Sequence, residues 1–187
     1  IPFYGELGAI NPVVALPQAL ASRGAELATA LAGSITQGCG QFCTNPGTVL
    51  LIDGAETDAF IPQLVAALQP LQPHAMLTAG MRHAFDHGIQ QLIAAGAQPL
   101  LGLPGQDGAP GPQLLQVPAQ RFIDEAPLRE EVFGPCSLLV RCTDVAEVLA
   151  VLHSIGGTLT TTLWGVDEDT EDNRALVRVA TAVAGRV

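Results

Sequence analysis

The chain has 187 residues, of which 48 % are hydrophobic, so it is long enough for one sizeable core and too hydrophobic to be disordered. Eighteen acidic residues against eight basic ones leave a net charge of −10. This balance argues against nucleic acid or an anionic membrane as a partner, because both are bound through basic patches. All eight basic residues are arginines, which excludes a Schiff-base lysine and a Gly-Lys-Ser/Thr phosphate loop in this chain.

The ends of the chain and its cysteines indicate the setting. No apolar run approaches the roughly 18–20 residues that span a bilayer, and no signal-peptide pattern stands at the N-terminus. Because the chain starts at Ile1 rather than Met, we interpret residues 1–187 as a single domain cut from a longer protein. Four cysteines in a domain of this size do not resemble a secreted disulfide framework, so we expect a cytoplasmic protein.

The order of predicted elements gives the fold class. In the first half we expect a helix from Pro17 to Gly33, an ordered loop over 35–47, a buried strand over 48–52, a helix with Thr57 or Asp58 as its N-cap, and a helix over about 74–95. In the second half we expect strands over 99–103, 113–117, 136–142 and 158–164, a surface loop over 104–112, a helix with Asp144 as its N-cap, and a last helix from the acidic run 167–172. This alternation predicts an α/β fold with a mostly parallel open sheet and helices on both faces. Ligands of such sheets bind beyond the carboxyl ends of the strands, so we expect the site there.

The loop around Cys43 is the strongest chemical signal in the sequence. Gly38 and Gly40 precede the cysteine, and Pro46-Gly47 turns the chain away from it, which suits close approach of a ligand to the main chain. A cysteine acts as a nucleophile in its thiolate form, and backbone N–H groups directed at the sulfur can stabilise that form. The alternative is an inert, buried cysteine.

Two carboxylate motifs flank this loop in the sequence. Glu6 lies among small and apolar residues, where a partly desolvated carboxylate suits a general base for water. Glu131 and Phe133 precede a Gly-Pro turn, and they could accept ribose hydroxyls and pack on a flat ring, respectively. Each motif also has a plain structural interpretation: Glu6 at a strand edge, and an acidic surface corner with a core aromatic.

Other candidates are weaker. His83 and His87 share a helix face but have no third ligand at a recognisable spacing, so we expect no metal site. Cys39 could trap Cys43 as a disulfide on oxidation, although their spacing is not that of a redox dithiol. Cys136 and Cys142 lie in a predicted strand, where we expect them to fill the core.

Taken together and in this order, the motifs carry a family likeness. Residues 6–12 (ELGAINP), 40–44 (GQFCT) and 130–135 (EEVFGP) resemble the aldehyde dehydrogenase superfamily over essentially the whole chain. Asn11-Pro12 and 43–47 (CTNPG) look most like the branch of 2-oxoglutarate semialdehyde and NADP-dependent long-chain aldehyde dehydrogenases.

The resemblance implies a function and roles for four residues. It implies that residues 1–187 are the catalytic domain of an NAD(P)-dependent enzyme that oxidises a small-molecule aldehyde to a carboxylate. Cys43 would attack the aldehyde, Glu6 would activate water against the resulting thioester, Glu131 would hold the nicotinamide ribose, and Phe133 would contact the nicotinamide end. It further implies a homo-oligomeric full-length protein, with NADP or NAD bound mainly by a cofactor domain absent from this chain.

The sequence also departs from the family pattern. Gly8-Ala9-Ile10 stands where the family usually has Gly-Gly-Lys, and the oxyanion asparagine belongs to the absent domain. We therefore predict negligible turnover by residues 1–187 alone. Two other functions stay open: a cysteine hydrolase that pairs Cys43 with a histidine (His74, His83, His87 or His153), and a non-catalytic binding domain.

Overall fold

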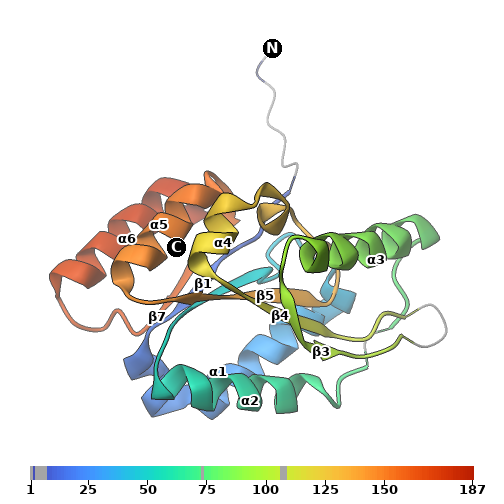
Figure 1. Ribbon diagram of the computed structural model, residues 1–187, viewed down its shortest axis with the longest axis horizontal. Helices are drawn as coiled ribbons and strands as arrows, with labels where there is room; N and C mark the ends of the chain where they lie inside the picture. The colour runs from blue at the N-terminus through green and yellow to red at the C-terminus, as the bar shows by residue number, and fades with distance from the viewer. Residues whose placement is uncertain (1, 3–7, 73, 106–108) are drawn as a thin grey trace.

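The computed structural model describes residues 2, 8–72, 74–105 and 109–187, and it confirms the α/β prediction (Figure 1). A six-stranded sheet has the order β3-β4-β5-β2-β1-β7, and all of its strand pairs except the antiparallel β3–β4 pair are parallel. Its strands are β1 (Val13–Ala15), β2 (Thr48–Ile52), β3 (Gln98–Gly102), β4 (Gln113–Pro118), β5 (Cys136–Cys142) and β7 (Thr162–Trp164). A small parallel pair consists of β6 (Thr158–Thr160) and β8 (Ala184–Arg186).

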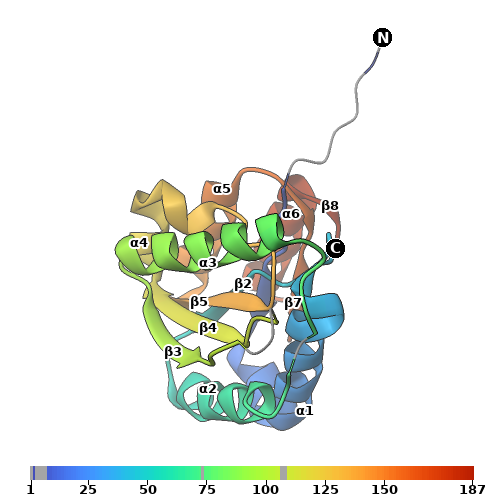
Figure 2. The ribbon, with the colours of Figure 1, turned by 90° about the vertical axis from the view of Figure 1, so that its right-hand side faces the viewer.

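Helices cover both faces of the sheet (Figures 1 and 2). One face is covered by α1 (Pro17–Thr36) and α2 (Ala55–Leu68). The other is covered by α3 (Ala79–Ala94), α4 (Ala119–Asp124), α5 (Val145–Ile155) and α6 (Glu171–Val183). Two short 3-10 helices, η1 (Gln37–Gly40) and η2 (Ala126–Arg129), lie in the connections. No helix among the described residues is long and apolar enough to cross a membrane.

The central strands are apolar on both sides because each side faces a helical layer. In β2, Val49 and Leu51 pack into the core beneath α1 and α2, whereas Leu50 between them packs into the core beneath α3–α6. Leu139 of β5 joins the first core, and Leu138 joins the second. All five residues are at most 2 % exposed. Burial on both sides explains the unbroken apolar runs of these strands.

Several element boundaries differ from the sequence-based expectation. The helix predicted to start at Thr57 or Asp58 begins at Ala55, because Thr57 Oγ1 bonds to the carbonyl of Ile52 rather than capping a helix. The helix predicted from residue 74 begins only at Ala79, where Thr78 Oγ1 accepts a hydrogen bond from Met81 N.

Three further differences concern short elements. The strand predicted over 158–164 is two strands, β6 and β7, that belong to different sheets. The short elements β1, α4 and β8 were not predicted, because three to six residues carry too little periodicity to be recognised. The helix that was expected to end at Gly33 continues to Thr36.

Candidate active site

The three sequence motifs lie at the amino ends of neighbouring parallel strands. Asn11 precedes β1, Cys43 precedes β2, and Glu131 precedes β5, while β1 pairs with β2 and β2 with β5. The expectation that the site lies at the carboxyl ends of the strands is therefore wrong for these residues. The physical reason is that each motif residue lies in the loop that enters its strand, and parallel strands align all such loops along one edge.

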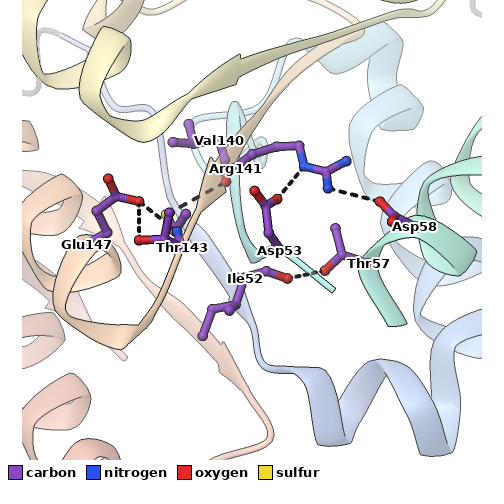
Figure 3. Close-up of polar contacts among 9 residues, drawn as sticks. Ile52, Asp53, Thr57, Asp58, Val140, Arg141, Thr143 and Glu147 are labelled. Carbon is purple, nitrogen blue, oxygen red and sulfur yellow. Dashed lines mark hydrogen bonds and ion pairs between the residues drawn. The ribbon is translucent and has the colours of Figure 1, made fainter. Parts of the chain in front are cut away.

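Figure 3 shows what occupies the carboxyl edge instead. Arg141, at the end of β5, forms ion pairs with Asp53, which follows β2, and with Asp58 of α2. Beside them, Glu147 of α5 accepts hydrogen bonds from the amide and the hydroxyl of Thr143. These charged groups bind one another and tie α2 and α5 to the sheet, so this edge has a structural role.

Cys43 lies in a tight turn and is exposed to solvent. The turn is closed by a hydrogen bond of 3.0 Å from Asn45 N to the carbonyl of Phe42, and Gly47 N then bonds to the carbonyl of Asn45 at 2.8 Å. Phe42, beside the thiol, is 45 % exposed. A thiol on such a turn is accessible to a small reagent, which argues against the alternative of a buried, inert cysteine.

The turn is fixed to the loop that carries Glu131 and Phe133. Asn45 Nδ2 donates to the carbonyl of Gly134 at 2.9 Å, and Ser137 Oγ donates to the carbonyl of Pro46 at 2.8 Å. Gly40 approaches the same loop so closely that a Cβ at this position would lie 2.1 Å from the carbonyl carbon of Gly134. Only glycine fits there, and its φ of +66° also suits glycine.

Helix α3 packs against the loop that carries Glu131 and Phe133. A Cβ on Gly134 would lie 2.2 Å from the ring of Phe85, and a Cβ on Gly88 would lie 3.0 Å from Val132. Phe85 is buried, whereas Phe133 is half-buried at the surface of the loop. The loop is thus packed between α3 and the Cys43 turn, with Glu131 exposed at its start.

The segment before β1 contacts both loops. A Cβ on Gly8 would lie 3.2 Å from Glu131 Oε2, and Asn11 Nδ2 donates to the carbonyl of Cys43 at 2.8 Å. Glu6 lies outside the described residues. The structure therefore brings together Cys43, Glu131 and Phe133, and the role of Glu6 stays a prediction.

The remaining cysteines are not candidates for chemistry. Cys39, Cys136 and Cys142 are at most 3 % exposed. Burial raises the pKa of Cys39, and it raises the pKa of Cys136 and of Cys142 to about 12. All four thiols are unpaired in the structure, so the disulfide between Cys39 and Cys43 is not formed in it.

These differences predict selective alkylation. In the native protein at about pH 8, iodoacetamide should modify Cys43 and leave the other three cysteines unmodified, because they are buried and their thiolates are disfavoured. Peptide mapping by mass spectrometry would locate the label. Denaturant should expose all four to the reagent as the control. Equal labelling of Cys39 and Cys43 in the native protein would contradict the prediction.

The histidines do not support the hydrolase or metal alternatives. Among the described residues, no hydrogen bond joins the Cys43 sulfur to a histidine, and the ring of His74 bonds to the carbonyl of Ala75. Within the same part of the chain, no three His, Cys, Asp or Glu side chains are grouped to hold a metal ion. His83 and His87 lie on α3, as the sequence indicated.

Sequence reasoning missed three residues that hold the site together. Asn11, Asn45 and Ser137 are each at most 6 % exposed, and each bonds to the main chain of the site loops. The signal that could have found Asn11 is its position as one polar residue in an apolar run, where it must be hydrogen-bonded.

Comparison with known proteins gives consistent matches. The model of the family described as "Aldehyde dehydrogenase family" matches residues 1–183. Alpha-ketoglutaric semialdehyde dehydrogenase 2 of Azospirillum brasilense is 42 % identical over 191 residues, which are 100 % of this chain and 36 % of that protein. Alpha-ketoglutaric semialdehyde dehydrogenase of Acinetobacter baylyi is 34 % identical, again over 100 % of this chain and 36 % of that protein. The chain thus spans about a third of the length of these curated relatives.

A solved structure supports the fold. The crystal structure of NAD-dependent aldehyde dehydrogenase from Sinorhizobium meliloti superimposes with a TM-score of 0.79 at 22 % identity. The match covers 97 % of this chain and 37 % of that chain.

Proposed function

Because the chain belongs to the aldehyde dehydrogenase family, we propose that it is the catalytic domain of a longer, NAD(P)-dependent enzyme with Cys43 as its nucleophile. The observation that carries the proposal is the exposed thiol of Cys43, held on a rigid turn against the loop of Glu131 and Phe133. Neither a scaffold nor a hydrolase explains this pairing. A scaffold needs no exposed thiol, and a cysteine hydrolase needs a base beside the sulfur.

In the proposed mechanism Cys43 forms a bond to the carbonyl carbon of the aldehyde. The oxygen gains negative charge in this step, and the amide of Cys43 is one donor that would stabilise it. Loss of hydride from the same carbon leaves a thioester on Cys43. Glu6 then takes a proton from water as the water attacks the thioester, and the carboxylic acid leaves with the thiolate restored.

The residues present fit the nicotinamide end of the cofactor. A carboxylate such as that of Glu131 accepts hydrogen bonds from ribose hydroxyls, and the aromatic ring of Phe133 follows two residues later. Since Gly8 has no side chain, the main chain passes close to the Glu131 carboxylate. Gly8 and Glu131 border an open pocket of about 380 Å³ that Arg129 also lines. When bound, an oxidised nicotinamide cofactor (NAD or NADP) supplies the hydride acceptor.

For the substrate we propose 2-oxoglutarate semialdehyde, which both curated relatives are named for. One observation favours a second candidate, a long-chain aldehyde. Phe42 is 45 % exposed and Leu77 is 81 % exposed, and a hydrogen bond from Leu77 N to Gln41 Oε1 keeps Leu77 near the Cys43 turn. Exposed apolar side chains beside the nucleophile could bind an alkyl tail.

A substrate comparison tests the proposal. The purified full-length protein is assayed for reduced nicotinamide with 2-oxoglutarate semialdehyde and with decanal, each with NAD and with NADP. We expect kcat/KM for the semialdehyde to exceed that for decanal by about 100-fold or more, a difference of roughly 3 kcal/mol in transition-state binding. A preference for decanal would select the second candidate, and no oxidation of either would reject the function. Residues 1–187 alone should show no turnover.

A further inference from the structure

Asn11 is a buried amide at the meeting point of three segments. It is 2 % exposed and lies just before β1, in the segment that also passes Glu131 at Gly8. Its φ of +40° is in the left-handed region, which asparagine adopts more readily than most residues. A strained backbone and a buried polar side chain coincide at this position, and such a combination persists only where the surroundings fix it.

Every hydrogen-bonding group of the Asn11 side chain is used. Its Nδ2 donates to the carbonyl of Cys43 at 2.8 Å and to the carbonyl of Asn45 at 3.0 Å, with a longer contact of 3.4 Å to the carbonyl of Ala9. Its Oδ1 accepts from Thr160 N at 3.1 Å and from Thr160 Oγ1 at 3.2 Å. An amide has two donors and two acceptor sites, so this side chain is fully satisfied.

The two shorter bonds from Asn11 Nδ2 hold both ends of the turn that carries Cys43. The carbonyls of Cys43 and Asn45 belong to residues on either side of Thr44, and one amide group holds both of them. The bond to its carbonyl restrains rotation of the peptide between Cys43 and Thr44. It thereby restricts the positions that the Cys43 sulfur can take.

The two bonds that Asn11 Oδ1 accepts connect it to Thr160, near the C-terminal end of the chain. Thr160 belongs to β6, which pairs with β8, and Asn11 N also donates to Thr158 Oγ1 at 3.0 Å. The Asn11 side chain therefore connects strand β6 on one side to the Cys43 turn on the other.

We propose that Asn11 is a positioning residue for the nucleophile: its amide donors hold the Cys43 peptide in the geometry that attack and hydride loss require. This inference rests on the proposed function of Cys43. Asn11 touches neither substrate nor cofactor and acts through the main chain of Cys43. Because misplacement of a reacting group by about 1 Å can lower a rate by about 100-fold, the effect should fall on kcat.

The test is the Asn11→Asp variant of the full-length protein. Aspartate has nearly the same shape and keeps an acceptor for Thr160, but it cannot donate to Cys43 or Asn45 when ionised. We expect kcat to fall by about 10–100-fold while KM stays within about threefold. The introduced carboxylate should also shift the pH dependence of Cys43 alkylation by iodoacetamide to higher pH, because negative charge disfavours the thiolate.

Two variants separate positioning from a structural role. Thr160→Val removes one bond to Oδ1 but leaves both donor bonds, so its kcat should stay within about threefold of the wild type. Asn173→Asp is a matched control. Asn173 of α6 is also a buried asparagine (7 % exposed), and its Nδ2 donates to the carbonyl of Glu168. This substitution introduces the same charge away from the Cys43 turn, so it should keep kcat and the alkylation profile.

Several outcomes would overturn the inference. The first is a folded Asn11→Asp protein with kcat within threefold of the wild type and an unshifted alkylation profile. The second is an equal loss of kcat in Thr160→Val. If Asn11→Asp fails to fold, a crystal structure of the full-length wild type decides, and a distance from Nδ2 to the Cys43 carbonyl oxygen beyond about 3.5 Å rejects the inference. The alkylation profile needs no turnover, so it also tests the inference if wild-type aldehyde oxidation is absent.

Discussion

The Cys43→Ala variant of the full-length protein should lose aldehyde oxidation by about 10⁴-fold or more, because no covalent intermediate can form without the sulfur. The thiol is exposed on a turn whose conformation is set by main-chain bonds, so alanine fits the same backbone. We therefore expect an unchanged free energy of unfolding within about 0.5 kcal/mol. Steady-state assays and denaturant unfolding would measure the two effects on the same preparation.

Cys39→Gly provides the matched control for loss of a thiol in the same loop. Cys39 is fully buried and has φ = +60°, a conformation that glycine adopts without strain. In the free energy of unfolding, the lost packing of a small side chain is partly offset by the relief of backbone strain. The loop should therefore keep its geometry, and kcat should stay within about threefold of the wild type. Full activity in Cys43→Ala would contradict the assignment of the nucleophile. A comparable loss in both variants would mean that the loop, rather than the sulfur, matters.

The second large effect is expected from Gly40→Ala. The added Cβ would lie 2.1 Å from both the carbonyl carbon and the carbonyl oxygen of Gly134, which are backbone atoms that cannot move aside alone. The Cys43 turn and the Glu131 loop must then separate. We expect kcat to fall by about 100-fold and the free energy of unfolding to fall by about 2–4 kcal/mol, from the overpacking and the positive φ together.

Gly33→Ala is the control for this substitution. Gly33 lies in the exposed part of α1, and nothing would lie within 4 Å of an added Cβ. Alanine should raise the free energy of unfolding by about 0.5–1 kcal/mol and leave kcat unchanged. Urea unfolding followed by circular dichroism would measure both variants. A Gly40→Ala protein with wild-type stability would show that Gly40 and Gly134 are not in close contact.

The long, apolar elements could be predicted from the sequence because the order of apolar and polar residues reflects which positions are buried. The strands Thr48–Ile52 and Cys136–Cys142 have the predicted bounds, since a strand buried on both faces has consecutive apolar residues at its centre. The N-cap at Asp144 was also predictable. Its Oδ1 accepts a hydrogen bond from Glu147 N at 2.9 Å, as the local spacing of the two residues indicated.

Helix starts were less predictable where tertiary contacts compete with local signals. Leu77 has helical spacing from the apolar residues that follow it, yet it precedes α3 and is 81 % exposed. Its amide bonds to Gln41 Oε1, in the loop before Cys43. A contact across 36 residues thus replaces a turn of helix, and no local pattern encodes it.

The site itself was predictable as a set of motifs but not as an assembly. The sequence indicated Cys43, Glu131 and Phe133, but the expected edge of the sheet was wrong, because motif spacing does not say on which side of a strand a loop lies. The bonds of Asn45 to Gly134 and of Ser137 to Pro46 join segments about 90 residues apart. Such pairings follow from the topology of the whole sheet.

The contacts that hold the Cys43 turn also set the order in which this part of the structure can form during synthesis. The carbonyl of Cys43 is held by Asn11, which in turn depends on Thr160, 149 residues later. A ribosome must therefore add more than a hundred residues after the thiol before the turn acquires its final support. Translation products that end before Thr160 would therefore lack the bonds that hold Asn11 in place beside the Cys43 turn.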